Sequence, residues 1–136
     1  MKPIERILLI DDEEVDQRQY ARIITRSQLA GDLITFFYAD EALDFLLSRD
    51  SPEIDLIFLD INIPRMDGFE FLDALIEAKG LVEPTVIFML STSLDPADKA
   101  RALSYEAVKA FIDKPLRLKD IEYAARVVAD HAARAP

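Results

Sequence analysis

The sequence predicts an α/β domain, built as a doubly wound parallel sheet of five strands with five helices. Five short apolar runs occur along the 136 residues, and a helical pattern follows each of them. Most of the runs are continuous and rich in β-branched and aromatic residues, which is typical of strands buried on both faces. Regular alternation of strand and helix indicates a parallel sheet with helices on both sides and right-handed crossovers.

The elements can be taken in order along the chain. The runs predicted to form strands are Ile7–Ile10, Leu33–Tyr38, Leu56–Leu59, Val86–Leu90 and Val108–Ile112. The helical patterns cover residues 14–29, 40–48, 67–79, 96–105 and 117–132. We expect Asp67 and Asp95 to cap the third and fourth helices, with Pro96 at a first helical position. One face of the amphipathic last helix collects Leu118, Ile121, Ala125 and Val128.

Composition excludes several classes of protein. The formal net charge is −10 at pH 7, which argues against general binding to nucleic acid, because such binding needs basic surface. No apolar run approaches the roughly 20 residues of a membrane span, and the N-terminus lacks a secretory signal. Cysteine is absent, so disulfide and thiol chemistry are excluded. We therefore expect a cytoplasmic protein that does not bind membranes.

Polar residues stand at the ends of four predicted strands. Asp11 and Asp12 follow the first strand, Asp60 the third, Ser91 the fourth and Lys114 the fifth. Ligands of such sheets bind beyond the carboxyl ends of the strands. Clustered carboxylates either raise one another's pKa or attract a cation, and oxygen ligands suit Mg²⁺. A carboxylate can act as nucleophile in phosphoryl transfer, with a lysine and a hydroxyl holding the phosphoryl oxygens.

Four segments stand in order at the ends of the first, third, fourth and fifth predicted strands. They are Ile10-Asp11-Asp12-Glu13, Asp60-Ile61-Asn62-Ile63-Pro64-Arg65-Met66-Asp67-Gly68, Leu90-Ser91-Thr92-Ser93 and Asp113-Lys114-Pro115. Together they resemble the motifs of the receiver (response regulator) family of two-component signalling, of the chemotaxis-regulator-like type. The resemblance covers roughly residues 5–130. The resemblance implies a flavodoxin-like fold with the strand order 2-1-3-4-5.

The resemblance also implies a role for each residue of the site. Asp60 would be the phosphoacceptor. Asp12 would bind Mg²⁺ directly, Asp11 would act partly through water, and the backbone carbonyl of Asn62 would complete the protein ligands. Lys114 would pair with the phosphoryl group, or with Asp60 before phosphorylation.

Further residues are expected to respond to the phosphoryl group. Ser91 would move toward it, and Phe111 stands at the position of the family's switch aromatic, although a purely structural role for this side chain is equally open. The resemblance also implies that Asn62 and Ser93 border the path of attacking water. Both are small and polar, so we expect them to admit water and to tune dephosphorylation. Gly68 would give the loop after Asp60 backbone freedom.

The implied protein is a stand-alone receiver covering residues 1–136, without an effector domain. A sensor histidine kinase or a histidine phosphotransfer protein would donate the phosphoryl group. The output would be a downstream protein partner, a further relay step or a homodimer, and these three remain open. The surface that changes would consist of the fourth helix, the fifth strand and the fifth helix.

Three alternatives compete with this interpretation. Haloacid-dehalogenase-type phosphatases also use an aspartate nucleophile and Mg²⁺, but they need a second aspartate where this chain has Asn62. A dinucleotide-binding domain needs a glycine-rich turn after its first strand, and the only glycines are Gly31, Gly68 and Gly80. A degenerate receiver, acting as a binding module, usually lacks an acidic residue, the acceptor or the lysine, and all of these are present. We therefore expect no enzyme beyond self-catalysed phosphotransfer and autodephosphorylation.

Overall fold

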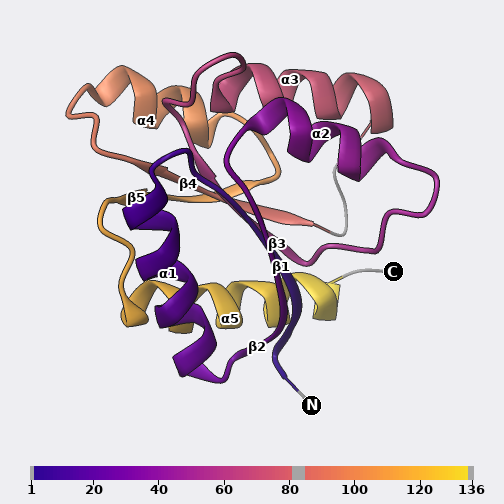
Figure 1. Cartoon of the computed structure of the whole chain (residues 1–136), viewed down its shortest axis with the longest axis vertical. Coiled ribbons are helices and arrows are strands. Elements are labelled where there is room, and N and C mark those ends of the chain that lie inside the picture. Colours follow the sequence, from indigo (N-terminus) through magenta and orange to yellow (C-terminus); the bar gives the residue numbers. More distant parts are fainter. Residues whose placement is uncertain (1, 81–84, 135–136) are drawn as a thin grey trace.

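The computed structural model describes residues 2–80 and 85–134, and it shows a five-stranded parallel sheet between two layers of helices (Figure 1). The strand order is β2-β1-β3-β4-β5, as predicted. The strands are β1 (Ile4–Ile10), β2 (Ala30–Phe36), β3 (Leu56–Asp60), β4 (Val86–Ser91) and β5 (Val108–Asp113). The helices are α1 (Glu14–Ser27), α2 (Ala39–Leu47), α3 (Gly68–Lys79), α4 (Pro96–Leu103) and α5 (Leu118–Arg134).

The sheet has an apolar core on each face. Because successive strand residues point to opposite faces, each central strand contributes alternate side chains to both cores. Helices α2, α3 and α4 cover one face, and α1 and α5 cover the other (Figure 1). The side chains of the central strands beneath α2 to α4 are Leu8, Ile10, Ile57, Leu59, Ile87 and Met89. Those beneath α1 and α5 are Ile4, Ile7, Leu9, Leu56, Phe58, Val86, Phe88 and Leu90.

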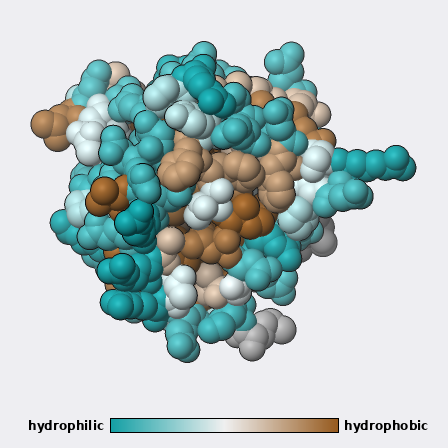
Figure 2. Space-filling model, viewed as in Figure 1, coloured by the Kyte–Doolittle hydropathy of each residue, from teal (hydrophilic) through white to brown (hydrophobic). Residues whose placement is uncertain are grey.

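The prediction that most of the strands are buried on both faces is confirmed for β3 and β4, and β2 is an exception. Every residue of β3 and β4 is buried, whereas β2 lies at the sheet edge, where Asp32 and Thr35 are exposed. The strand also ends earlier than predicted, because pairing with β1 runs from Ala30 to Phe36 and Tyr38 already serves as the N-cap of α2. Figure 2 shows apolar side chains gathered between α1 and α2 on the face drawn in Figure 1, with polar ones around them.

The helix starts agree with the predicted caps, with one correction to the predicted core face. Asp67 caps α3 in a capping box with Glu70, and Asp95 caps α4. Leu118, however, is 49% exposed. It is the first residue of α5, and Leu116 just before the helix fills the core instead, at 1% exposed.

No helix in the described ranges 2–80 and 85–134 has the length and apolar character needed to cross a membrane.

Candidate functional site

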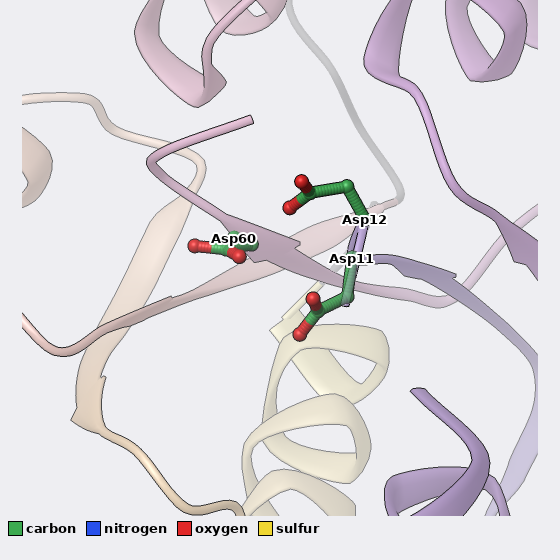
Figure 3. A group of neighbouring side chains, drawn as sticks. All are labelled: Asp11, Asp12 and Asp60. Carbon is green, nitrogen blue, oxygen red and sulfur yellow. The ribbon is translucent and has the colours of Figure 1, made fainter. Parts of the chain in front are cut away.

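Three carboxylates meet where β1 and β3 end. Ile10 pairs with Leu59 in the sheet, so the residues that follow them, Asp11 and Asp60, come out side by side. Figure 3 shows Asp11, Asp12 and Asp60 gathered at this edge. One carboxylate oxygen from each lies within 4.8 Å of the others.

Lys114 reaches this cluster from the end of β5. Its Nζ donates to Asp11 Oδ2 at 2.9 Å and to Asp60 Oδ2 at 3.0 Å, and its side chain is only 7% exposed. The backbone N–H of Lys114 donates to the Ser91 carbonyl at 3.0 Å, which ties the lysine to the end of β4. The residues at four strand ends therefore form one connected site.

Burial determines the electrostatics of the two inner carboxylates. Burial, reinforced by the negative charge of Asp11, raises the pKa of Asp60 to about 6, although the Lys114 ammonium opposes the shift. Burial also raises the pKa of Asp11, against the lowering effect of its hydrogen bond from Lys114. Burial alone would lower the pKa of Lys114, but its bonds to Asp11 and the charge of Asp60 outweigh burial and raise it. The ammonium is therefore a permanent charge of the site.

The acidic cluster has the composition of a site for a hard divalent cation. When ionised, its three carboxylates exceed the single ammonium of Lys114 by two negative charges. The available donors are oxygen atoms, which Mg²⁺ prefers, and Mg²⁺ commonly binds through one or two carboxylates together with water. The residues present therefore fit the predicted metal.

The loop after Asp60 corrects one prediction. Gly68 was expected to provide backbone freedom, but its φ is not positive, and the residue of this loop with a positive φ is Arg65, at 76°. Gly68 is required for space instead. A Cβ on it would lie 3.0 Å from both the Asp60 carbonyl oxygen and the Ile61 Cα. Its N–H donates to the Ile61 carbonyl at 2.8 Å, which brings the start of α3 against the end of β3.

Asn62 and Ser93 take different positions at the site. Asn62 is exposed, and its backbone N–H donates to Asp60 Oδ1 at 3.2 Å. Ser93 is half-buried, and its hydroxyl donates to Asp98 Oδ2 at 2.7 Å and accepts from the Asp95 N–H at 3.1 Å. The Ser93 hydroxyl therefore takes part in the N-terminal cap of α4.

Ser91 and Phe111 lie in the two strands beyond β3. Ser91 is fully buried as the last residue of β4, and its Oγ accepts from the Ser93 N–H at 2.8 Å. Phe111 pairs with Met89 in the sheet and packs, half-buried, against the core beneath α2 to α4. It also lines a surface cavity of about 470 Å³ between β5 and the start of α5.

Two residues of the site were missed in the sequence, and both belong to α1. Asp16 Oδ2 lies 3.4 Å from Lys114 Nζ. The buried Gln17 donates through Nε2 to the backbone carbonyls of Asp11 at 3.2 Å and Phe36 at 2.9 Å. A signal for Gln17 was present, because it shares a helical stripe with the buried Tyr20 and Ile24. Asp16 resembled an ordinary acidic residue of a first helical turn.

Comparisons with known proteins agree with this geometry. A family model described as response regulator receiver domain matches residues 7–126. The response regulator Rcp1 of Synechocystis sp. is 32% identical over 124 residues, covering 88% of this chain and 82% of that protein. The two-component response regulator ORR1 of Oryza sativa subsp. japonica is 33% identical, covering 88% of this chain. This chain spans about half of that rice protein, 53% of its length.

Solved structures show the same fold. A two-component response regulator from Cytophaga hutchinsonii superposes with a TM-score of 0.86 at 26% identity, covering 96% of this chain and 99% of that one. The Mn²⁺-bound form of the response regulator Rcp1 superposes with a TM-score of 0.72 at 25% identity, covering 96% and 93%. The second of these structures holds a divalent cation, Mn²⁺.

Proposed function

This chain belongs to the response regulator receiver family, and on that premise we propose that it is a phosphorylation switch whose acceptor is Asp60. One observation carries the proposal. Lys114 Nζ bridges Asp11 and Asp60 at 2.9 and 3.0 Å, directly beside a cluster of three carboxylates. An ammonium held in this place can bind an oxygen of a phosphoryl group on Asp60 without a large movement.

The donor is a phosphohistidine, carried by a sensor histidine kinase or a histidine phosphotransfer protein. An Asp60 carboxylate oxygen attacks the phosphorus, the P–N bond breaks, and the imidazole leaves with the bond's electron pair. With its pKa near 6, Asp60 is mostly ionised at neutral pH and can act as the nucleophile. The Asn62 N–H holds Oδ1, and Lys114 holds Oδ2 and then a phosphoryl oxygen.

Asp11, Asp12, Asp60 and the backbone carbonyl of Asn62 would hold Mg²⁺, which supplies positive charge next to the phosphoryl oxygens. Two features support this role. The donor atoms of the cluster are oxygens, and the carboxylates outnumber the ammonium.

Phosphorylation then shifts the population between two packed states, because the contacts to the phosphoryl group exist in only one of them. The Ser91 hydroxyl gives up the hydrogen bond that it accepts from the Ser93 N–H and binds a phosphoryl oxygen instead, and this change moves the start of α4. Phe111 turns inward as the loop between β4 and α4 moves. The changed surface of α4, β5 and α5 serves a downstream protein partner, a relay step or a homodimer, and we place the protein in the cytoplasm.

Mass spectrometry after incubation with acetyl phosphate tests the proposal. We expect one phosphoryl adduct with Mg²⁺, and none in EDTA or in Asp60→Asn. Asp67→Asn is the matched control, because it changes an aspartate of the same loop outside the acidic cluster, and asparagine also caps helices. An adduct that still forms in Asp60→Asn would show that another residue is the acceptor. No adduct, even with a phosphohistidine donor, would indicate a binding module.

The lifetime of the adduct tests the proposed roles of Asn62 and Ser93. Asn62 is exposed and Ser93 half-buried, so we expect water to reach the phosphoryl group and the adduct to decay quickly. Replacing either residue with a larger one should slow the decay, followed as loss of the adduct over time. A long-lived adduct whose decay is unchanged by both substitutions would contradict these roles.

A further inference from the structure

The loop between β3 and α3 contains a strained turn centred on Arg65. Arg65 has a φ of 76°, and the Pro64 carbonyl accepts a hydrogen bond from the Met66 N–H at 2.9 Å. A hydrogen bond that spans two residues around a φ near +75° defines the rare and strained form of the γ-turn. A residue other than glycine keeps such a backbone conformation only where the surrounding structure holds it there.

Two contacts hold Arg65, and both come from the start of α2. Its Nη2 donates to both carboxylate oxygens of Asp40, at 2.8 and 2.7 Å. Its guanidinium lies over the Tyr38 ring, 4.0 Å from the centroid. We call Arg65, Asp40 and Tyr38 the Arg65 clamp. It joins the loop after Asp60 to the junction of β2 and α2, which is 25 residues away in sequence.

The partners of Arg65 are themselves fixed. Asp40 lies in the first turn of α2, where the helix dipole favours a negative charge. Tyr38 is the N-cap residue of that helix and packs, half-buried, against the core. The clamp therefore attaches the loop to the start of α2, where Tyr38 packs against the core.

The other end of the loop is anchored at the acidic site. Ile61 and Ile63 are buried, and between them the exposed Asn62 donates its N–H to Asp60 Oδ1. Asn62 stands three residues before Arg65, so the loop is held near both ends, and the Asn62 carbonyl proposed as a metal ligand belongs to the held segment. Without the clamp the γ-turn would lose what opposes its strain, and the path of residues 62–66 would loosen.

We propose that Arg65 is a positioning residue, which with Asp40 and Tyr38 holds the loop beside Asp60 in the conformation that binds a divalent cation. This inference rests on the proposed function. The clamp could instead be an ordinary surface ion pair, since its side chains are 49% and 41% exposed and such pairs contribute little stability. Metal affinity distinguishes the positioning role from an ordinary ion pair. A residue that holds the strained turn in place changes the affinity for the metal, whereas an ordinary surface ion pair leaves that affinity unchanged.

Calorimetric titration with Mg²⁺ tests the inference. Asp40→Asn removes the ion pair but keeps the shape of the side chain and the Tyr38 contact. We expect its Mg²⁺ dissociation constant to rise about tenfold, at the low end for residues that orient metal ligands. The Met66 amide should exchange hydrogen faster, while the thermal midpoint in EDTA stays near that of the wild type.

The matched control is Asp44→Asn, which removes the same charge from an exposed position one turn further along α2. It should bind Mg²⁺ like the wild type. Arg65→Lys keeps the positive charge but loses the planar contact, and combining it with Asp40→Asn should weaken binding no more than the stronger single change.

Three results would overturn the clamp: wild-type affinity in Asp40→Asn, equal weakening by Asp40→Asn and Asp44→Asn, or additive effects of the two clamp variants. A wild-type protein that does not bind Mg²⁺ is a different result. That result would contradict the proposed function, and the proposed role of the Arg65 clamp in metal binding would fail together with it.

Discussion

Asp60 is a residue at which the proposed function opposes stability. The residue is 5% exposed, and burial together with Asp11 raises its pKa from 3.8 to about 6 despite Lys114. A raised pKa means that the folded protein holds this proton more tightly than the unfolded chain does. The contribution of Asp60 to stability therefore falls as the pH rises from near 3.8 through about 6.

We expect Asp60→Asn to stabilise the metal-free protein at neutral pH by on the order of 2 kcal/mol, because asparagine removes a buried charge while keeping the shape. The gain should shrink as the pH falls through about 6 and vanish near the ordinary carboxyl pKa of 3.8. Urea unfolding in EDTA across this pH range measures it. Asp44→Asn should follow the wild-type profile. A gain that does not depend on pH would contradict the assigned cause.

Gly68 illustrates a residue required by space alone. A Cβ there would lie 3.0 Å from the backbone of Asp60 and Ile61, which cannot move aside without shifting the acceptor. We expect Gly68→Ala to cost about 1–3 kcal/mol, as overpacking does, and to weaken Mg²⁺ binding in a titration. At Gly80 a Cβ would meet no atom within 4 Å, but the φ of this residue is 75°, which strains an alanine. Gly80→Ala should therefore lower the stability of the protein and leave its Mg²⁺ affinity unchanged. Unchanged metal binding in Gly68→Ala would refute this account.

At the scale of elements, the start of α4 is linked to the site by hydrogen bonds. Asp95 accepts from the Ala97 N–H at 2.9 Å, and Ser93 accepts from the Asp95 N–H. The Ser93 N–H in turn donates to Ser91 Oγ at the end of β4. A movement of Ser91 would therefore reach the first turn of α4 through two residues.

We expect Asp95→Ala to destabilise the protein by about 1 kcal/mol, because the helix loses its N-cap. Hydrogen exchange of the Ala97 amide should accelerate, and urea unfolding should give the loss of stability. Asp44→Ala, which removes a carboxylate from an exposed helical position without a capping role, should change stability by less than about 0.5 kcal/mol. Equal losses in the two variants would show that Asp95 contributes no cap.

At the scale of the whole molecule, the acidic site opposes folding, and the proposed cation would relieve the repulsion among its carboxylates. The chain carries a formal charge of −10, and three of its carboxylates converge at one edge of the sheet. A ligand that binds only the folded state stabilises it by RT ln(1 + [L]/Kd), which is about 2.7 kcal/mol when the free ligand is at a hundred times its dissociation constant.

We therefore expect Mg²⁺ to raise the thermal midpoint, and Asp12→Asn to remove most of that increase, because it deletes one of the three carboxylates. Differential scanning calorimetry measures both. Sodium chloride at equal ionic strength is the control for general screening, and it should raise the midpoint less. An equal effect of the two salts would contradict a specific site.

The sequence by itself determined the order of the elements, the central strands and the caps Asp67 and Asp95. It also placed Asp11, Asp12, Asp60, Ser91 and Lys114 at one edge of the sheet. These features follow from local patterns, because the period of apolar residues and the ends of parallel strands depend on neighbouring residues and on a general rule of topology.

The tertiary structure alone decided the features that depend on distant neighbours. Lys114 meets Asp16 across 98 residues, and Arg65 meets Asp40 across 25. The exposure of β2, the space that Gly68 must leave and the exposed place of Leu118 are likewise set by what packs beside them. The pattern of one segment predicts which of its faces is apolar. It does not predict which other element packs against that face.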